Sequence, residues 1–195
     1  MSVAGLILAA GESRRMGYPK ALLEWRGETF LDHLIGLFDA QCSPVIAVLG
    51  ARGEEIRAGV RRPATFVVNP DYRLGQITSM QCGLRAVPSE AAGVLFTLVD
   101  HPNVQPETLA ALLRPSRGAM PLLRVPRFQG RRGHPVFFSR QLIPEFLALS
   151  AEEAARDVVR AHASEIEYVE VGDAGILDDV DDPAAYLRLK GTAEP

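Results

Sequence analysis

The sequence has 195 residues, of which 47% are hydrophobic and 23% are charged, and its formal net charge is −3. A chain of this size can bury a sizeable core, and this composition excludes a disordered protein. Because the net charge gives no overall basic surface, we expect no nucleic-acid partner.

No apolar stretch is long enough to span a membrane, and the first residues lack the basic start and long apolar core of a signal peptide. We therefore expect a cytoplasmic protein with no membrane partner. Cys42 and Cys82 stand alone, without CxxC spacing, so we expect two reduced thiols.

Apolar runs of strand length alternate with helical patterns along the chain. The expected strands cover residues 3–9, 44–50, 64–68, 93–99, 119–123, 135–138 and 166–171. The expected helices cover residues 28–41, 54–60, 78–86, 106–114, 140–149, 152–162 and 184–189. This alternation predicts a single three-layer α/β/α domain with a mostly parallel, Rossmann-like sheet, whose ligands lie beyond the carboxyl ends of the strands.

No internal repeat or linker divides the chain, so we expect one domain over residues 1–190 and a frayed tail over 191–195. The segment 124–133 is rich in Arg, Pro and Gly, which predicts the most mobile part of the chain.

The loop after the first strand carries the strongest functional signal. It opens with the small-residue turn Ala9, Ala10 and Gly11, and the cations Arg14, Arg15 and Lys20 follow. Main-chain N–H groups in such a turn approach an anion closely, and the cations neutralise charge that the turn cannot offset. A solvated basic loop is the alternative for each residue alone, but the combination favours a nucleotide-binding loop.

Two commoner phosphate-binding motifs do not fit this loop. A P-loop requires Gly-Lys-Ser/Thr at its end, whereas Gly17 is followed by Tyr18 and Pro19. A Rossmann dinucleotide fingerprint requires glycines where this chain has Ala9 and Glu12.

Carboxylates occur at two further places of interest. Asp100 directly follows the apolar run 94–99, so it is expected at the ligand edge of the sheet, where it can bind Mg²⁺ or cap the next helix. The second place is the acidic cluster Asp178, Asp179, Asp181 and Asp182. One of these carboxylates can meet Asp100 across a metal, whereas Asp182 before Pro183 is also a good helix cap.

Two other loops carry candidate ligand contacts. Ser79, at the end of the strand-to-helix segment 69–80, can cap a helix or point at a ligand. The segment 131–135 places two arginines beside His134, which suits a phosphorylated substrate, although a solvated loop is the alternative.

These residues resemble the MobA-like NTP-transferase family, and within it most closely the molybdenum cofactor cytidylyltransferases. The motifs that carry the resemblance run almost from end to end: LAAGxSxRMGxxK at 8–20, NPxxxxGxxxS at 69–79, VDxP at 99–102, GHP at 133–135 and DVDxP at 179–183. The family commonly has Asp-Thr-Pro-Glu-Asp where this chain has DDPAA at 181–185, which keeps the first Asp and loses two later acidic residues.

The resemblance implies the fold of nucleotide-diphospho-sugar transferases and a nucleotidyl transfer. The terminal phosphate of molybdopterin attacks the α-phosphorus of CTP or GTP and releases pyrophosphate. Arg15, Lys20 and Asp100 are the implied catalytic residues, and Mg²⁺, with Mn²⁺ as an alternative, is implied between Asp100 and Asp181. Asp179 remains an alternative metal partner. The implied contacts to the nucleotide come from Leu8, Ala9, Ala10, Gly11, Arg15, Lys20, Ser79 and Asp100.

In the family an Ala-Ala-Gly turn accompanies cytosine and an Ala-Gly-Gly turn accompanies guanine, so the turn at 9–11 favours CTP. Arg132, Gly133 and His134 fall where the family receives its pterin acceptor. We expect the segment 124–133 to become ordered when the acceptor binds, and a molybdenum hydroxylase to be the partner that uses the product.

The main alternatives are the same chemistry with GTP, or with a sugar or alcohol phosphate as acceptor. A non-catalytic accessory protein that binds molybdenum cofactor is a further alternative. An α/β domain with merely solvated loops is the last.

Overall fold

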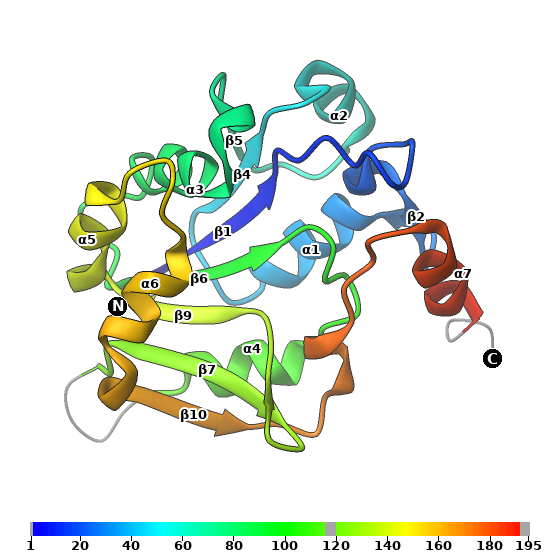
Figure 1. The fold of residues 1–195 in the computed structure, drawn as a ribbon. Helices are drawn as coiled ribbons and strands as arrows, with labels where there is room; N and C mark the ends of the chain where they lie inside the picture. Colours follow the sequence, from blue (N-terminus) through cyan, green and yellow to red (C-terminus); the bar gives the residue numbers. More distant parts are fainter. Residues whose placement is uncertain (1, 116–119, 192–195) are drawn as a thin grey trace.

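The computed structural model describes residues 2–115 and 120–191, and one eight-stranded sheet lies at its centre (Figure 1). The strands lie in the order β10-β7-β9-β6-β1-β4-β5, with β8 paired to β7. Their bounds are β1 (Val3–Ala9), β4 (Val45–Leu49), β5 (Thr65–Val68), β6 (Gly93–Leu98), β7 (Leu123–Phe128), β8 (Arg131–Arg132), β9 (Val136–Ser139) and β10 (Ile166–Glu170). A separate small hairpin pairs β2 (Glu24–Trp25) with β3 (Glu28–Thr29).

The sheet is mostly parallel. β1 pairs in parallel with β4 and β6, β4 with β5, and β7 with β10. β9 runs antiparallel to β6 and β7, and β8 runs antiparallel to β7. The expected α/β class is thereby confirmed. Because β1, β4 and β6 end at the same edge, the loops that follow them are neighbours.

Helices cover both faces of the sheet (Figure 1). On one face, α1 (Phe30–Asp39), α2 (Gly53–Gly59), α4 (Pro106–Leu113) and α7 (Pro183–Gly191) supply apolar side chains to the core. On the other face the core contains side chains of α3 (Gln76–Leu84), α5 (Ile143–Ala148) and α6 (Ala155–Ala161). The 3₁₀ turns are η1 (Lys20–Leu22), η2 (Tyr72–Leu74), η3 (Arg140–Leu142), η4 (Ala163–Glu165) and η5 (Ala174–Leu177).

β1 is buried on both faces, which explains its continuous apolar sequence. Ile7 belongs to the core beside α1, and Leu6 and Leu8 belong to the core beside α3. A Cβ on Gly5 would lie 2.8 Å from Cδ1 of Phe38, so glycine allows α1 to pack directly on this strand.

The first long helix begins later than expected. The periodicity predicted a helix over 28–41, but residues 28 and 29 pair with β2 and α1 starts at Phe30. Thr29 caps the helix, because its hydroxyl oxygen accepts a hydrogen bond of 3.0 Å from the main-chain N–H of Asp32.

The segment 124–133 belongs to a hairpin of the sheet and is not the loop that its composition suggests. Residues 123–128 form β7, which continues into β8 through the turn of Gln129 and Gly130, both with positive φ. Arg124 is only 1% exposed, and its guanidinium donates to the carbonyls of Leu112 and Arg114 at the end of α4, at 2.8 and 2.6 Å. An arginine that satisfies helix carbonyls can be buried in a strand, which composition alone does not reveal.

Smaller expectations have mixed outcomes. The strand expected over 119–123 begins only at Leu123, and residue 119 lies outside the described residues. Residues 192–195 of the expected frayed tail also lie outside them, whereas Gly191 is the last residue of α7. Both cysteines are free thiols, as expected, and burial raises the pKa of Cys42 to about 12. Among the described residues, no helix combines the length and apolarity needed to cross a bilayer.

Candidate functional site

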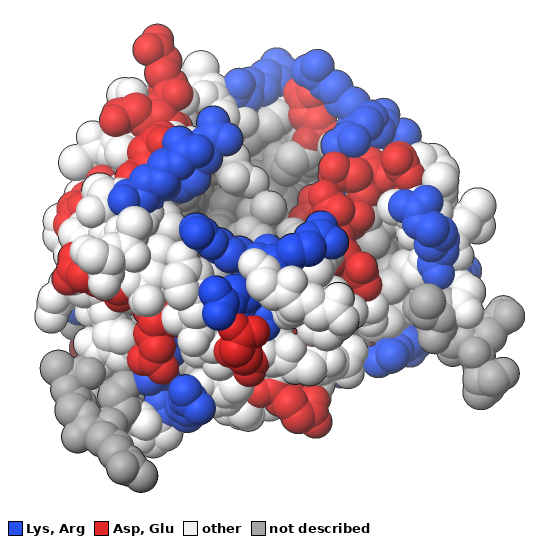
Figure 2. Space-filling view, turned by 60° about the horizontal axis from the view of Figure 1, so that its bottom comes forward, with Lys and Arg blue, Asp and Glu red and all other residues white. Residues whose placement is uncertain are grey.

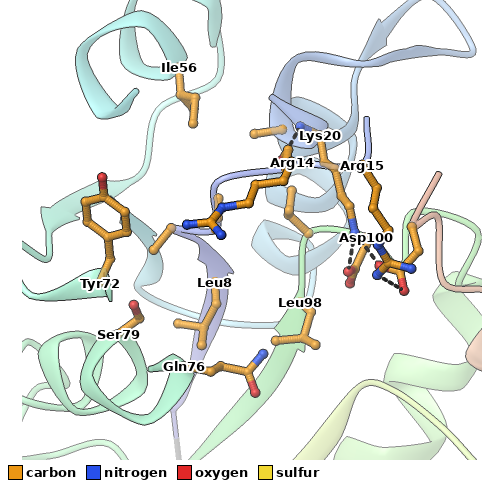
Figure 3. Close-up of a pocket in the computed structure, with 17 residues that line it drawn as sticks. Leu8, Arg14, Arg15, Lys20, Ile56, Tyr72, Gln76, Ser79, Leu98 and Asp100 are labelled. Atoms are coloured by element: carbon orange, nitrogen blue, oxygen red, sulfur yellow. Dashed lines mark hydrogen bonds and ion pairs between the residues drawn. The ribbon is translucent and has the colours of Figure 1, made fainter. Parts of the chain in front are cut away.

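A cleft of about 320 Å³ opens at the carboxyl ends of β1 and β6 (Figure 3). It is lined by all the residues that the resemblance placed at the nucleotide, and by both carboxylates that it placed at the metal: Leu8, Ala9, Ala10, Gly11, Arg15, Lys20, Ser79, Asp100 and Asp181. Arg14, the third cation of the predicted nucleotide-binding loop, also lines the cleft. The sequence assigned no role to the remaining lining residues, which are Ser13, Ala21, Ile56, Tyr72, Gln76, Leu98 and Val99. No local pattern shows that α2 and η2 reach the same cleft.

The loop after β1 folds back on itself through Ser13, which has a left-handed φ of 51°. The carbonyl of Ser13 accepts from the N–H groups of Met16 and Gly17, each at 3.0 Å. Its hydroxyl oxygen accepts from the N–H of Lys20 at 3.1 Å. Ser13 thus closes the loop and fixes the start of η1, where the lysine side chain turns into the cleft.

Lys20 joins the two carboxylates of the cleft. Its Nζ donates to Oδ2 of Asp100 at 2.9 Å and to Oδ1 of Asp181 at 2.6 Å (Figure 3). Burial lowers the pKa of Lys20, but the two carboxylates outweigh this effect and the pKa is raised. The hydrogen bond from Lys20 is the largest cause of the lowered pKa of Asp181. The lysine is therefore a fixed cation between two fixed anions.

The four carboxylates of the acidic cluster have different surroundings. Asp181 faces Lys20, whereas the exposed Asp179 lines neither this cleft nor the neighbouring groove described below. Asp182 caps α7 by accepting from the N–H of Ala185 at 2.8 Å. Asp178 accepts from Nδ2 of Asn103 at 2.9 Å. Asp100 does not cap α4, because the N-cap position belongs to Gln105.

The two arginines of the loop differ in what they contact. Arg15 forms an ion pair of 2.7 Å with Oδ2 of Asp181. Arg14 pairs with Glu12, is 84% exposed, and extends across the cleft (Figure 3). Both arginines line the cleft and bring positive charge to it.

Ser79 lies within α3 and not at its N-cap, so it does not have the capping role that the sequence offered as one alternative. Its hydroxyl oxygen accepts from Nδ2 of Asn69 at 2.9 Å, and the same amide donates to Thr78 at 2.9 Å. Asn69 therefore links the end of β5 to α3 and holds Ser79 at the wall of the cleft. Tyr72 faces the same wall from η2 (Figure 3).

Asp100 and Asp181 fit a divalent cation in donor type and position. Oδ1 of Asp100 is buried and has no hydrogen-bond partner, so one oxygen of this carboxylate is free for a further ligand. Within residues 2–115 and 120–191, no cluster of three or more His, Cys, Asp or Glu forms a complete metal site. Two carboxylates supplemented by phosphate oxygens are the coordination that Mg²⁺ prefers.

A groove of about 360 Å³ adjoins the cleft, with which it shares Gln76 and Leu98. Arg132, Gly133 and His134 line it, so the structure brings together the three residues that the resemblance assigned to the acceptor. Most of the remaining lining is apolar: Met80, Phe96, Leu123, Val125, Val136, Phe138, Phe146, Ala155 and Val159.

The residues at 133 and 134 are packed tightly at the edge of this groove. A Cβ on Gly133 would lie 2.1 Å from the carbonyl oxygen of Ile176, so only glycine fits there. The N–H of His134 donates to the same carbonyl at 3.0 Å. The His134 ring packs against those of His101 and Phe96, at 4.8 and 5.6 Å between centroids. Burial, and then His101, lower the pKa of His134 to about 4.

Figure 2 shows a hollow on one face of the molecule, with Lys and Arg around much of its rim and a band of Asp and Glu on one side. The arginines that line the cleft and the groove are Arg14, Arg15, Arg132 and Arg156. A rim of arginines favours anionic ligands.

A small-residue turn, a lysine and two carboxylates at the carboxyl edge of an α/β sheet define a nucleotidyltransferase. The chain belongs to the MobA-like NTP transferase family, whose domain model matches residues 5–166.

The sequence is similar to several proteins of other organisms. It is 30% identical to the molybdenum cofactor cytidylyltransferase of Escherichia coli, over 95% of this chain and 94% of that protein. It is 32% identical to the purine catabolism protein PucB of Bacillus subtilis, over 95% of each chain. It is 35% identical to a probable molybdenum cofactor guanylyltransferase of Mycobacterium ulcerans, over 58% of this chain and 56% of that protein.

Solved structures have the same fold. Rv0371c of Mycobacterium tuberculosis superposes with a TM-score of 0.87 at 29% identity, over 98% of this chain and 99% of that chain. The same protein in complex with manganese gives a TM-score of 0.83 at 28% identity, over 98% of this chain and 100% of that chain.

Proposed function

We propose that this protein transfers CMP from CTP to the terminal phosphate of molybdopterin and releases pyrophosphate. The observation that carries the proposal is the position of Lys20 between Asp100 and Asp181, in a cleft lined by the turn Ala9, Ala10 and Gly11. In the transfer, a phosphate oxygen of the acceptor bonds to the α-phosphorus. The bond from that phosphorus to the bridging oxygen breaks, and both electrons leave with pyrophosphate.

Some residues of the cleft position the nucleotide, and others neutralise the charge of its phosphates. Main-chain groups of residues 8–11, with Ser79 nearby, bind the base and ribose. Arg15 and Lys20 bind the triphosphate, and Lys20 stabilises the charge that develops on the α-phosphate and the leaving group. Asp100 and Asp181 would hold Mg²⁺ or Mn²⁺, which neutralises phosphate charge when bound. The manganese complex of Rv0371c supports a divalent cation as the cofactor.

Two observations support CTP as the donor. The turn is Ala-Ala-Gly rather than Ala-Gly-Gly, and the cytidylyltransferase of Escherichia coli matches nearly the whole chain. The similarity to guanylyltransferases covers a smaller share of the chain, and it makes GTP the second candidate.

The adjoining groove supports a molybdopterin acceptor. Its apolar walls suit a flat heterocycle, and Arg132 suits an anionic group at its rim. A molybdenum hydroxylase would take up the dinucleotide product.

The test is pyrophosphate release by the purified protein with Mg²⁺ and molybdenum cofactor, with CTP, GTP, ATP and UTP in parallel. Release with CTP alone is expected. Release with GTP would change the base assignment only. Release with a sugar or alcohol phosphate, but not with molybdenum cofactor, would overturn the acceptor. No release with any nucleotide or acceptor would favour the accessory-protein alternative.

A further inference from the structure

Two residues form the boundary between the cleft and the groove. Gln76 and Leu98 line both cavities, and they are the residues that the two linings share. Gln76 is the first residue of α3, and Leu98 is the last residue of β6. Figure 3 shows the carboxamide of Gln76 extending from α3 toward Leu98. This pair therefore lies where the groove meets the cleft.

Gln76 is the polar member of the pair, and its carboxamide is available to a ligand. The residue is exposed, and within residues 2–115 and 120–191 no group forms a hydrogen bond with its carboxamide. By contrast, the carboxamide of Gln81, on the same helix, donates to the carbonyls of Phe146 and Leu149 at 3.0 and 2.8 Å. Gln81 thus links α3 to the end of α5, whereas Gln76 lies at the boundary of the two cavities without such a bond.

The local backbone adds to the preference for an anion. α3 has nine residues, and its N-terminus, with the positive end of the helix dipole, lies at Gln76. Gly75 precedes it with a φ of 127°, which glycine adopts without strain and which turns the chain abruptly into the helix. An amide donor at this point can hydrogen-bond a phosphate oxygen without adding charge to the lysine and arginines of the cleft.

We propose that the Gln76 carboxamide hydrogen-bonds the terminal phosphate of the acceptor and holds it in line with the α-phosphorus of the nucleotide. This inference rests on the proposed function, because it concerns the attacking phosphate of the same reaction. None of the contacts proposed above for the base or the triphosphate comes from Gln76. Its loss is therefore expected to impair the use of the acceptor and not the binding of CTP.

The experiment compares Gln76→Ala, Gln76→Glu and the control Gln141→Glu. A glutamate in the first turn of α3 is compatible with the helix dipole, so Gln76→Glu should fold. Gln141 is an exposed glutamine of η3 that lines neither cavity, so the same substitution there should have no effect. Each variant is assayed for pyrophosphate release over a range of molybdenum cofactor concentrations, and its affinity for CTP·Mg²⁺ is measured by calorimetry.

We expect Gln76→Ala to lower kcat/KM for the acceptor roughly tenfold, the loss expected for one hydrogen bond to a charged group. Gln76→Glu should lose more, because its carboxylate repels the phosphate, and both variants should bind CTP·Mg²⁺ as the wild type does. Unchanged kcat/KM, or an equal loss of CTP affinity, would overturn the assignment of Gln76. A silent wild type would reject the proposed function itself, and the assignment with it.

Discussion

The cleft and the groove are similar in size, about 320 and 360 Å³, but opposite in character. In the cleft, Lys20 lies at hydrogen-bond distance from two carboxylates, and Arg15 pairs with one of them. In the groove, aromatic and aliphatic side chains cover the sheet, and arginines stand at the margin. The difference indicates two kinds of ligand group: the cleft suits charged groups, and the groove suits an apolar group.

Lys20→Ala should have the largest effect on the charged cavity. It removes the cation between Asp100 and Asp181 and leaves two carboxylates facing each other. We expect a loss of about 10³-fold in kcat, the order found when a preorganised stabilising group is removed. The measurement is pyrophosphate release. Lys190→Ala replaces the only other lysine of the chain, which lies in α7 and lines neither cavity, and it should retain full activity.

Asp181→Asn tests which acidic residue completes the cation site. The Mg²⁺ concentration needed for half-maximal rate should rise about 10- to 100-fold, since even the partners of metal ligands have effects of this order. Asp179→Asn is the matched control, because Asp179 is exposed and lines neither cavity. If Asp179→Asn shifted the Mg²⁺ titration and Asp181→Asn did not, the assignment of Asp181 would be wrong.

Gly133→Ala tests the packing at the edge of the groove. The added Cβ would meet the Ile176 carbonyl oxygen at 2.1 Å, so main chain must shift. We expect the free energy of unfolding to fall by about 3 kcal/mol, as measured by urea denaturation, together with a higher KM for the acceptor. Gly172→Ala serves as control, because nothing lies within 4 Å of a Cβ built there. Equal stability of the two variants would contradict the close packing.

The smallest effect concerns the pH dependence of stability. Burial lowers the pKa of His134 to about 4, so the folded protein leaves unprotonated a ring that the unfolded chain protonates below about pH 6.5. The stability that depends on this neutral ring is fully present above pH 6.5 and is lost as the pH falls toward 4. Between pH 7 and pH 5 the free energy of unfolding is expected to fall by roughly 2 kcal/mol.

The check is urea denaturation of wild type and His134→Gln at both pH values, with a shallower pH dependence expected for the variant. His162 should affect the pH dependence of stability in the opposite direction, so His162→Gln should lose stability mainly at low pH. Hydrogen bonds to Glu165 and Glu145 raise the pKa of His162, so its contribution is present at low pH and fades as the pH rises through that pKa. An identical pH dependence of wild type and His134→Gln would refute the buried, neutral imidazole.

Much of the fold follows from local sequence. β1 is buried on both faces and has a continuous apolar run, whereas α1 buries one face and has Leu31, Leu34 and Phe38 at helical spacing. Each pattern can be recognised within its own segment. The hairpin over 123–132 could not be predicted in this way. Its Arg, Pro and Gly residues are typical of a loop. Arg124 is nevertheless buried, with its guanidinium donating to carbonyls at the end of α4 and pairing with Glu167 of β10.

By itself, the sequence determined the order of the elements, the parallel class of the sheet and the loop that carries Lys20. Periodicity and turn chemistry act over a few residues and can be read locally. The tertiary structure alone decided that Lys20 meets Asp100, 80 residues away, and Asp181, 161 residues away. The N–H of Val180 donates to the carbonyl of Asp100 at 2.9 Å, which holds the C-terminal segment beside the end of β6. Such distant pairings depend on how the whole sheet and the C-terminal segment pack, and no short pattern encodes them.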